Sequence, residues 1–261
     1  DRGWLLEEET PQGTTAYTYD SRGNRTSKVD SSGTTTYEYN LNNQPTVIHH
    51  PNSNTTTLTY TTRGALSSVT TTSPPSTTYY SYRNCETLIM VQRQGSPDIN
   101  YVYNGMNQLV GRIEGTEVSS YHYDIGIGKE EGERNVTYNH DARGNLLSMT
   151  WNGQSYFYHF DALGNTIALS DSLGNIVASW NYNYFGSITS SFNPNQIPNV
   201  YLWRGNFGVR WDADTQLYLS PNGERAYFPG PEMFTRFGMC TCRSFTLPAT
   251  SYDEYRMDDV I

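Results

Sequence analysis

The chain has 261 residues, with 17 basic against 26 acidic side chains and a formal net charge of −9. This balance argues against a nucleic-acid partner, which needs a basic stripe, and no apolar run approaches the roughly 20 residues of a membrane span. Tyrosine supplies 22 residues and threonine is abundant, a composition that suits a pleated, half-wet sheet better than a thick aliphatic core.

The length allows one large all-β domain or two average ones. No signal peptide is recognisable at the start, and the first residue is Asp1 and not methionine. We therefore expect a processed or excised piece of a larger product. Asp1–Gln12 and the cysteine-containing tail lie outside the regular pattern and are candidates for capping sheet edges.

The first predicted element is a hairpin with the sequence YTYDSRGNRTSKV, from Tyr17 to Val29. Its Tyr-x-Tyr alternates with a period of two, which predicts a strand with both rings on one face. Asp-x-x-Gly-Asn then predicts a turn, because Asp accepts backbone N–H bonds while Gly and Asn tolerate the left-handed region. The predicted turn residues of this and two later repeats are Asp20, Gly23, Asn24, Asp141, Gly144, Asn145, Asp161, Gly164 and Asn165.

The hairpin recurs along the chain at intervals of 17 to 22 residues. We call the second aromatic of each repeat its post, and in most repeats another aromatic lies two residues earlier. A period held over this length is typical of a repeat architecture. The predicted posts, which we expect to pack across strands, are Tyr19, Tyr39, Tyr60, Tyr82, Tyr103, Tyr123, His140, Phe160 and Tyr182.

These elements predict an all-β chain in which tandem hairpins form a curved or spiralling antiparallel sheet. No substantial helix is expected, because apolar spacings of three and four are not sustained and Gly, Pro, Asn and Thr interrupt every candidate. A sheet with this many strands should curl or split, and its two ends would carry unpaired N–H and C=O groups.

The repeats resemble the YD repeats of the RHS (rearrangement hotspot) family, over roughly residues 10 to 190. Tyr158–Ser187 and Gly205–Gly238 are similar to a divergent form of the core that follows those repeats in the family. The resemblance implies a YD-repeat sheet over 1–157, a core over 158–238 continuous with it, and a tail over 239–261 that is a candidate edge cap. The core positions that carry it are Asp212, Tyr218, Arg225, Tyr227, Pro229 and Phe234.

The core departs from the family pattern where self-cleavage occurs in some members. Those members carry an Asp-Pro-containing motif after the core, whereas Phe234–Met239 contains no Asp. We therefore expect no self-cleavage there, no catalytic residues, and a chain that is not an enzyme.

The resemblance also implies a partial shell. In bacterial toxins of the family a spiral β-sheet encloses a C-terminal effector, and in animal teneurins a larger version sits on the cell surface. Nine repeats give about 18 strands, which cover about three-fifths of one turn around a 100-residue cargo. The expected partners are other copies or the rest of a longer RHS chain at the sheet edges, with a protein cargo or glycans as further candidates.

Two groups of residues could carry other chemistry. Cys85, Cys240 and Cys242 allow a disulfide from the first to one of the pair, and reduced cysteines filling small gaps are equally consistent. Asp212 and Asp214 could bind Ca²⁺ or replace protease acids, but turn-residue preferences favour a corner at 211–215. We expect no metal and no cofactor.

These observations predict a non-catalytic, extracellular or cell-surface structural protein, either a β-shell or a self-assembling fibre element. The alternatives are the core-proximal fragment of a secreted polymorphic toxin and a glycan-binding adhesin with exposed aromatics.

Overall fold

The computed structural model describes residues 3–10, 13–83, 87–123, 130–133, 135–221, 225–230 and 233–234, with only the backbone of 130–133 and Phe234. The chain divides into two compact units, with the described residues of unit 1 inside Asp1–Thr78 and those of unit 2 inside Tyr79–Arg236. The boundary predicted at residue 157 falls inside unit 2.

Unit 1 is an antiparallel sheet in which each strand pairs with the next along the chain. Residues predicted as an N-terminal cap supply its first strand. The strands are β1 (Glu7–Thr10), β2 (Gly13–Tyr19), β3 (Arg25–Asp30), β4 (Gly33–Tyr39), β5 (Pro45–His49), β6 (Thr55–Tyr60) and β7 (Leu66–Thr72). Strand β8 (Pro75–Arg83) spans the division between the units.

Unit 2 continues the same hairpins and adds a smaller sheet. We call β9–β19 the wall; its strands are β9 (Thr87–Arg93), β10 (Ile99–Tyr103), β11 (Leu109–Glu114), β12 (Glu117–Tyr123), β13 (Glu130–Glu133), β14 (Val136–His140), β15 (Leu146–Trp151), β16 (Gln154–Phe160), β17 (Thr166–Ser170), β18 (Ile176–Tyr182) and β19 (Ile188–Phe192). The small sheet has β20 (Arg210–Asp212), β21 (Leu217–Leu219), β22 (Ala226–Phe228) and β23 (Met233–Phe234).

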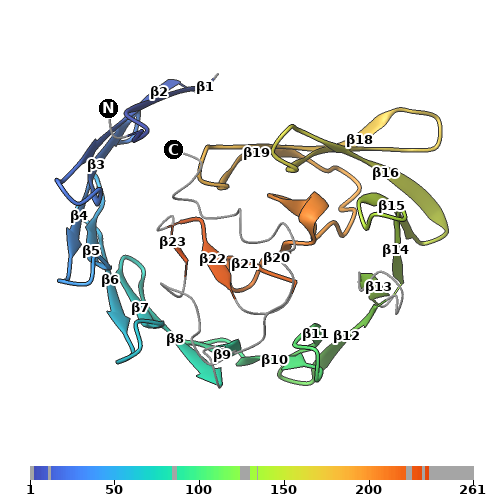
Figure 1. The fold of residues 1–261 in the computed structure, drawn as a ribbon, viewed down its shortest axis with the longest axis horizontal. Coiled ribbons are helices and arrows are strands. Elements are labelled where there is room, and N and C mark those ends of the chain that lie inside the picture. Colours follow the sequence, from blue (N-terminus) through green and yellow to red (C-terminus); the bar gives the residue numbers. More distant parts are fainter. Residues whose placement is uncertain are drawn as a thin grey trace. The chain divides into compact units, whose positions relative to one another are not determined.

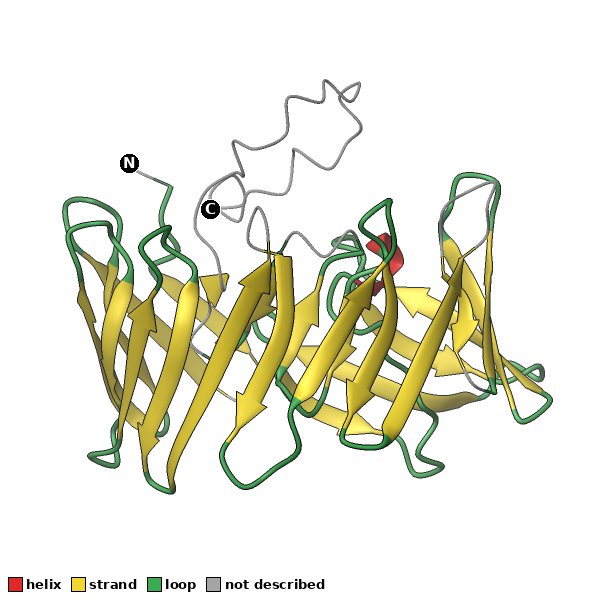
Figure 2. Ribbon diagram, turned by 90° about the horizontal axis from the view of Figure 1, so that it is seen from below, coloured by secondary structure: helices red, strands yellow, loops and turns green. Residues whose placement is uncertain are grey.

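Within unit 2 the wall curves around the small sheet (Figure 1). In each unit, the loops that join successive strands lie alternately at the two opposite ends of the strands (Figure 2). The described residues contain a single three-residue 3-10 turn, Gly205–Phe207, and no helix among them has the length and apolar character needed to span a bilayer. The prediction of an all-β chain of tandem antiparallel hairpins without substantial helix is confirmed.

The strand ladders shift register by a bulge at the posts, a feature that period-two reasoning did not predict. A bulge leaves a backbone group without its ladder partner, and a side chain can satisfy it. The Tyr39 hydroxyl donates to the Arg25 carbonyl at 2.9 Å, and the Tyr182 hydroxyl to the Thr166 carbonyl at 2.8 Å. The posts with a register shift are Tyr19, Tyr39, Tyr60, Tyr103, Tyr123, His140, Phe160 and Tyr182.

In each predicted turn, the Asp carboxylate accepts hydrogen bonds from later residues of the same turn. Asp20 Oδ1 accepts the N–H groups of Arg22 at 2.8 Å and Asn24 at 2.9 Å, while Asp20 Oδ2 accepts the Asn24 side-chain amide at 2.8 Å. The side-chain bond from Asn24 is the main cause that lowers the pKa of Asp20 below its ordinary value. The same bonds recur at Asp141 and Asp161, so one local arrangement serves all three turns.

Candidate functional site

The best-defined site in unit 2 is the surface where residues 197–234, which we call the core segment, pack on the wall. The first aromatics of successive repeats line this surface and are nearly inaccessible to solvent: Tyr101, Tyr121, Tyr138 and Tyr158. The Tyr138 ring meets Tyr201 edge-on at 4.9 Å, and the Tyr158 hydroxyl donates to Asn199 Oδ1 at 2.9 Å. The wall therefore presents its repeat aromatics to the core segment.

An ion-pair cluster fastens the small sheet to β10 and β11. Tyr101 and Arg112 lie opposite each other on these strands, and both reach Asp212 of β20. The Tyr101 hydroxyl donates to Asp212 Oδ2 at 2.6 Å, and Arg112 Nε donates to the same oxygen at 2.9 Å. Arg112 also donates to Asp214 Oδ2 at 2.6 Å. Asp212 is buried, so these donors replace the water that its carboxylate loses.

The cluster continues on the wall through Glu114, which accepts from Arg112 at 2.9 Å and from Arg93. Burial raises the pKa of Tyr101 well above its ordinary value, and the charge of Asp212 raises it further, so the phenol stays protonated and donates. Burial by itself would lower the pKa of Arg112, but the hydrogen bond and charge of Asp212 raise it. Burial opposes the charged form of Glu114, yet Arg112 and Arg93 lower its pKa.

A cation–π contact adds to the cluster. Arg210, at the start of β20, lies with its guanidinium carbon 4.0 Å from the centre of the Tyr121 ring. Arg210 is buried, and an aromatic face is a favourable neighbour for a desolvated guanidinium. Three strands of the wall, β10 to β12, thus contribute a polar or aromatic group to hold β20.

The turn 161–165, between β16 and β17, also contacts the core segment. The Asn206 N–H donates to the Gly164 carbonyl at 3.1 Å, and the Arg204 N–H donates to Asn165 Oδ1 at 2.9 Å. A Cβ on Gly164 would lie 2.4 Å from the Phe207 ring. Glycine is therefore needed here for its positive φ of 79° and for close approach of Phe207.

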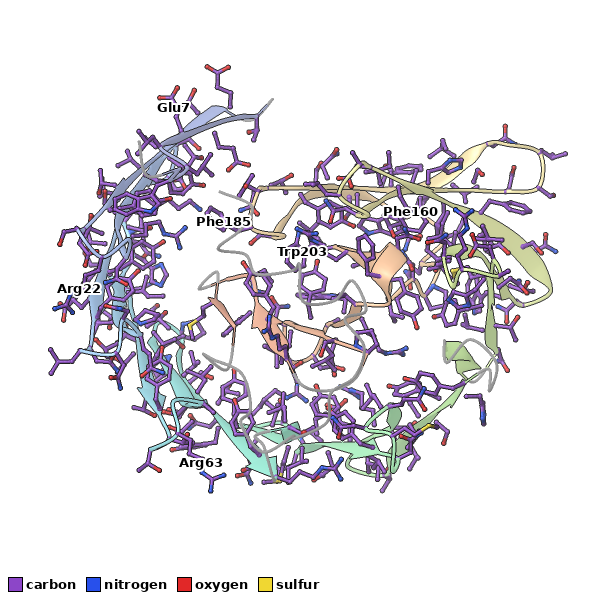
Figure 3. All side chains as sticks on the ribbon, in the orientation of Figure 1. Glu7, Arg22, Arg63, Phe160, Phe185 and Trp203 are labelled. Carbon is purple, nitrogen blue, oxygen red and sulfur yellow. The ribbon has the colours of Figure 1, made fainter. Side chains whose placement is uncertain are left out.

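The turn between β18 and β19, at the same end of the strands as the turn 161–165, contacts an aromatic cluster. A Cβ on Gly186 would lie 2.7 Å from the Trp203 ring, and Figure 3 shows Trp203 beside the turn that carries Phe185. The Trp203 ring is 5.0 Å from Tyr227, whose hydroxyl donates to the Phe185 carbonyl at 2.9 Å. The Tyr218 hydroxyl donates to the Gly186 carbonyl at 3.2 Å. Buried aromatics with satisfied hydroxyls give this end of the core segment a fixed position.

The predicted core positions fall on or near this surface. Asp212, Tyr218 and Tyr227 contact the wall as described, and the Pro229 carbonyl accepts the Ser187 hydroxyl at 3.0 Å. Arg225 is exposed, and Phe234 belongs to β23. The three cysteines of the candidate disulfide, Cys85, Cys240 and Cys242, lie outside the described residues, as does most of Phe234–Met239.

The carboxylate pair at the 211–215 corner has a structural role. Asp212 Oδ1 accepts the Asp214 N–H at 3.1 Å and the Thr215 N–H at 3.4 Å, as in a turn, and Arg112 neutralises both carboxylates. The part of the chain that the structure describes contains no group of three or more His, Cys, Asp or Glu residues placed to hold a metal ion.

The residues that bind Asp212 were not predicted from the sequence. Arg112 lies in β11 opposite Tyr101. The available signal was this cation, in a strand of period two, paired with an aromatic that faces inward. Trp203 and Phe207 had no such signal, because they lie outside the repeats and contact glycines distant in sequence.

A repeat-built β wall with a separate segment seated on its inner face defines a class of shell-forming β proteins, and comparisons with known proteins agree. The RHS repeat model matches residues 1–35, and the Teneurin YD-shell model matches residues 77–230. The chain therefore belongs to the RHS/YD-repeat family.

Two curated relatives are similar over 228 residues, which is 82% of this chain. The tRNA3(Ser)-specific nuclease WapA of Bacillus spizizenii is 30% identical, and the tRNA nuclease WapA of Bacillus subtilis strain 168 is 31% identical. The match spans 9% of each relative's length. Among solved structures, the crystal structure of TcdB2-TccC3-TEV is 16% identical with a TM-score of 0.46, covering 85% of this chain and 16% of that one.

These relatives correct two predictions. The main expectation of a non-catalytic structural protein or fibre element is wrong, because the curated relatives are named as tRNA nucleases. The expectation that the chain is not an enzyme is contradicted by the same names. The alternative of a toxin fragment agrees better with the relatives.

Proposed function

We propose that the chain is the core-proximal shell segment of a secreted polymorphic toxin, in which YD repeats enclose a C-terminal effector. One observation carries the proposal: the core segment is seated on the wall of unit 2 by repeat positions. Tyr101, Tyr138 and Tyr158, which occupy equivalent places in their hairpins, each contact it. A wall that receives the segment following its repeats is suited to receive a polypeptide on its inner face.

The effector that we propose is a nuclease acting on tRNA. This rests on the names of the curated relatives, of which the matched part is 9%. Because so little of each relative is matched, the enzymatic activity is proposed for the whole toxin, with this chain as part of its shell. The acidic balance of the chain, −9, supports a shell that repels the RNA substrate until the effector is released.

The proposed location is outside the producing cell. In the shell role the expected partners are a protein cargo on the inner face and further shell strands at the sheet edges. Buried aromatics favour this role over glycan binding, because the first aromatics Tyr101, Tyr121 and Tyr158 are each at most 8% exposed and cannot present a face to a sugar.

The test uses the full-length protein and a truncation that ends with this chain. The full-length protein should cleave tRNA after its shell is opened by mild denaturant, and the truncation should not. Limited proteolysis should release the effector only after opening. Absence of tRNA cleavage by the opened full-length protein would contradict the proposal. Full activity of the truncated protein would also contradict it, because the nuclease would then lie within this chain.

A further inference from the structure

Two Asn-Gly pairs of unit 2 share one dipeptide sequence and differ in their surroundings. They lie at 104–105 and 152–153, and a third pair, 222–223, lies outside the described residues. Asn-Gly is the dipeptide in which asparagine loses its side-chain amide most readily, because glycine has no Cβ beside the attacking backbone nitrogen. A Cβ added to Gly105 or Gly153 would meet nothing within 4 Å, so the two glycines are equally open. A difference in reactivity must then come from the asparagines.

The side chain of Asn104 is built into the turn between β10 and β11. Its Oδ1 accepts the N–H groups of Met106 and Gln108, each at 2.9 Å. Its Nδ2 donates to Gln108 Oε1 at 2.8 Å. Attack by the Gly105 nitrogen on Cγ would turn the side chain out of this arrangement and break these bonds. The fold therefore protects Asn104.

Asn152 lies at the exposed tip of the hairpin that joins β15 and β16. Asn152 and Gly153 have φ values of 50° and 75°, as in a two-residue turn of type I′. Among the described residues, none forms a hydrogen bond with the Asn152 side chain. The nearest ladder pair is Trp151 with Gln154, the last of the hairpin, and a loop tip of this kind opens locally at small cost.

We propose that Asn152 is a site of spontaneous deamidation in the folded chain. The Gly153 backbone nitrogen gives its proton to solvent and bonds to Cγ of Asn152. The Cγ–Nδ2 bond then breaks, and Nδ2 leaves as ammonia. Water opens the resulting cyclic imide at either of its carbonyls and gives aspartate or isoaspartate. The sequence consumes one water, releases one ammonia and involves no oxidation or reduction.

Both products would change this part of the wall. Residues 144–203 contain two charged side chains, Asp161 and Asp171, each bound to an asparagine of its own turn. Deamidation adds a third carboxylate at an exposed position. Isoaspartate also lengthens the backbone of a two-residue turn, which should disrupt the pair of Trp151 with Gln154. The turn 161–165 follows the opposite end of β16, so its contacts with the core segment should persist.

The experiment follows both asparagines in the purified chain by peptide mapping and mass spectrometry during incubation at mildly alkaline pH. In the folded chain we expect Asn152 to react at least about tenfold faster than Asn104, because only Asn104 must break its side-chain hydrogen bonds first. In guanidinium chloride both should react at similar rates, since both then are unfolded Asn-Gly pairs. This inference holds independently of the toxin proposal.

The matched variants test the cause of the difference. Gln108→Ala removes the acceptor of the Asn104 side chain and should raise the rate at Asn104 about fivefold in the folded chain. Gln154→Ala, at the exposed residue that follows the second pair, is the control and should leave the rate at Asn152 unchanged.

Hydrogen exchange of the isoaspartate form should be faster at Gln154 and unchanged at Leu169. Comparable rates at the two asparagines in the folded chain, a slower reaction at Asn152, or an unchanged rate at Asn104 in Gln108→Ala would each overturn the proposal.

Discussion

Two consecutive turns of unit 2, at 161–165 and 171–175, have the same local structure and different surroundings. In each, Asp Oδ1 accepts the Asn N–H at 2.9 Å, and Asp Oδ2 accepts the Asn side chain, at 2.7 Å and 3.0 Å. Gly164 and Gly174 have φ values of 79° and 85°. Yet a Cβ on Gly164 would meet Phe207 at 2.4 Å, whereas a Cβ on Gly174 would have no atom within 4 Å.

The difference separates what a repeat encodes from what its neighbours impose. Asp-x-x-Gly-Asn encodes a turn at both places, and only the first turn also holds the core segment. The docked turn should therefore respond to changes in the core segment, and the exposed turn should not. Four tests follow: the first concerns the opposite end of the core segment, and the other three compare or probe the two turns.

The largest effect is expected from Asp212→Ala. The change leaves Tyr101 and Arg112 without the carboxylate that they share, which should lower the free energy of unfolding of unit 2 by about 3 kcal/mol. Chemical denaturation followed by Trp fluorescence measures it. Asp214→Ala is the control, because Asp214 is half-exposed and its loss should cost below about 1 kcal/mol. Equal effects of the two variants would contradict the role given to Asp212.

The second test is the glycine pair itself. Gly164→Ala and Gly174→Ala both place a side chain at a positive φ, which should cost about 1 kcal/mol in each. Only the first also displaces Phe207, so its total cost should be about 3 kcal/mol. The difference between the urea midpoints of the two variants measures the contact of Gly164 with Phe207 alone. Equal midpoints would contradict a role for this contact in holding the core segment.

A smaller effect is expected from the asparagines of the same turns. Asn165→Ala and Asn175→Ala each remove a bond to the Asp carboxylate, and Asn165→Ala also removes the acceptor of the Arg204 N–H. The additional loss should be about 1 kcal/mol. Thermal unfolding of both variants under the same conditions checks it, and a larger loss in Asn175→Ala would contradict the assignment.

The smallest effect is a pH dependence of the exposed turn. The side-chain bond from Asn175 is the main cause that lowers the pKa of Asp171 in the folded chain. A carboxyl with a lowered folded pKa stabilises the fold above its unfolded pKa, and this contribution is lost as pH falls through the folded value. An NMR titration of the Asp171 carboxyl should show the lowered pKa, and Asn175→Ala should raise it. An unchanged pKa in that variant would show that the bond is not its cause.

The sequence supports prediction of what is local. Period-two aromatics indicate strands, and Asp20, Gly23 and Asn24 indicate a turn, because the forces involved act within a few residues. The bulges at the posts were not predictable in this way, since they concern the register between two strands and not the alternation within one, as where Tyr39 pairs with Pro45.

The site depends on contacts between distant residues, so little of it could be predicted. Asp212 and Tyr218 were identified through family resemblance, but their partners were not. Asp212 is 111 residues from Tyr101 and 100 from Arg112 in sequence, and no local pattern links them. The turn residues Gly164 and Asn165 were predicted for their backbone geometry alone, and their contacts with the core segment follow from the fold.

Native-state hydrogen exchange tests the central claim that the core segment and the wall of unit 2 form one cooperative unit. The docking amides are those of Thr166, Arg204 and Asn206, which donate to the Leu202 carbonyl, to Asn165 Oδ1 and to the Gly164 carbonyl. We predict that they open with the same free energy as the buried ladder amide of Leu169. Opening of the three docking amides at a much lower free energy, with Leu169 still protected, would show that the core segment detaches by itself and would contradict the account.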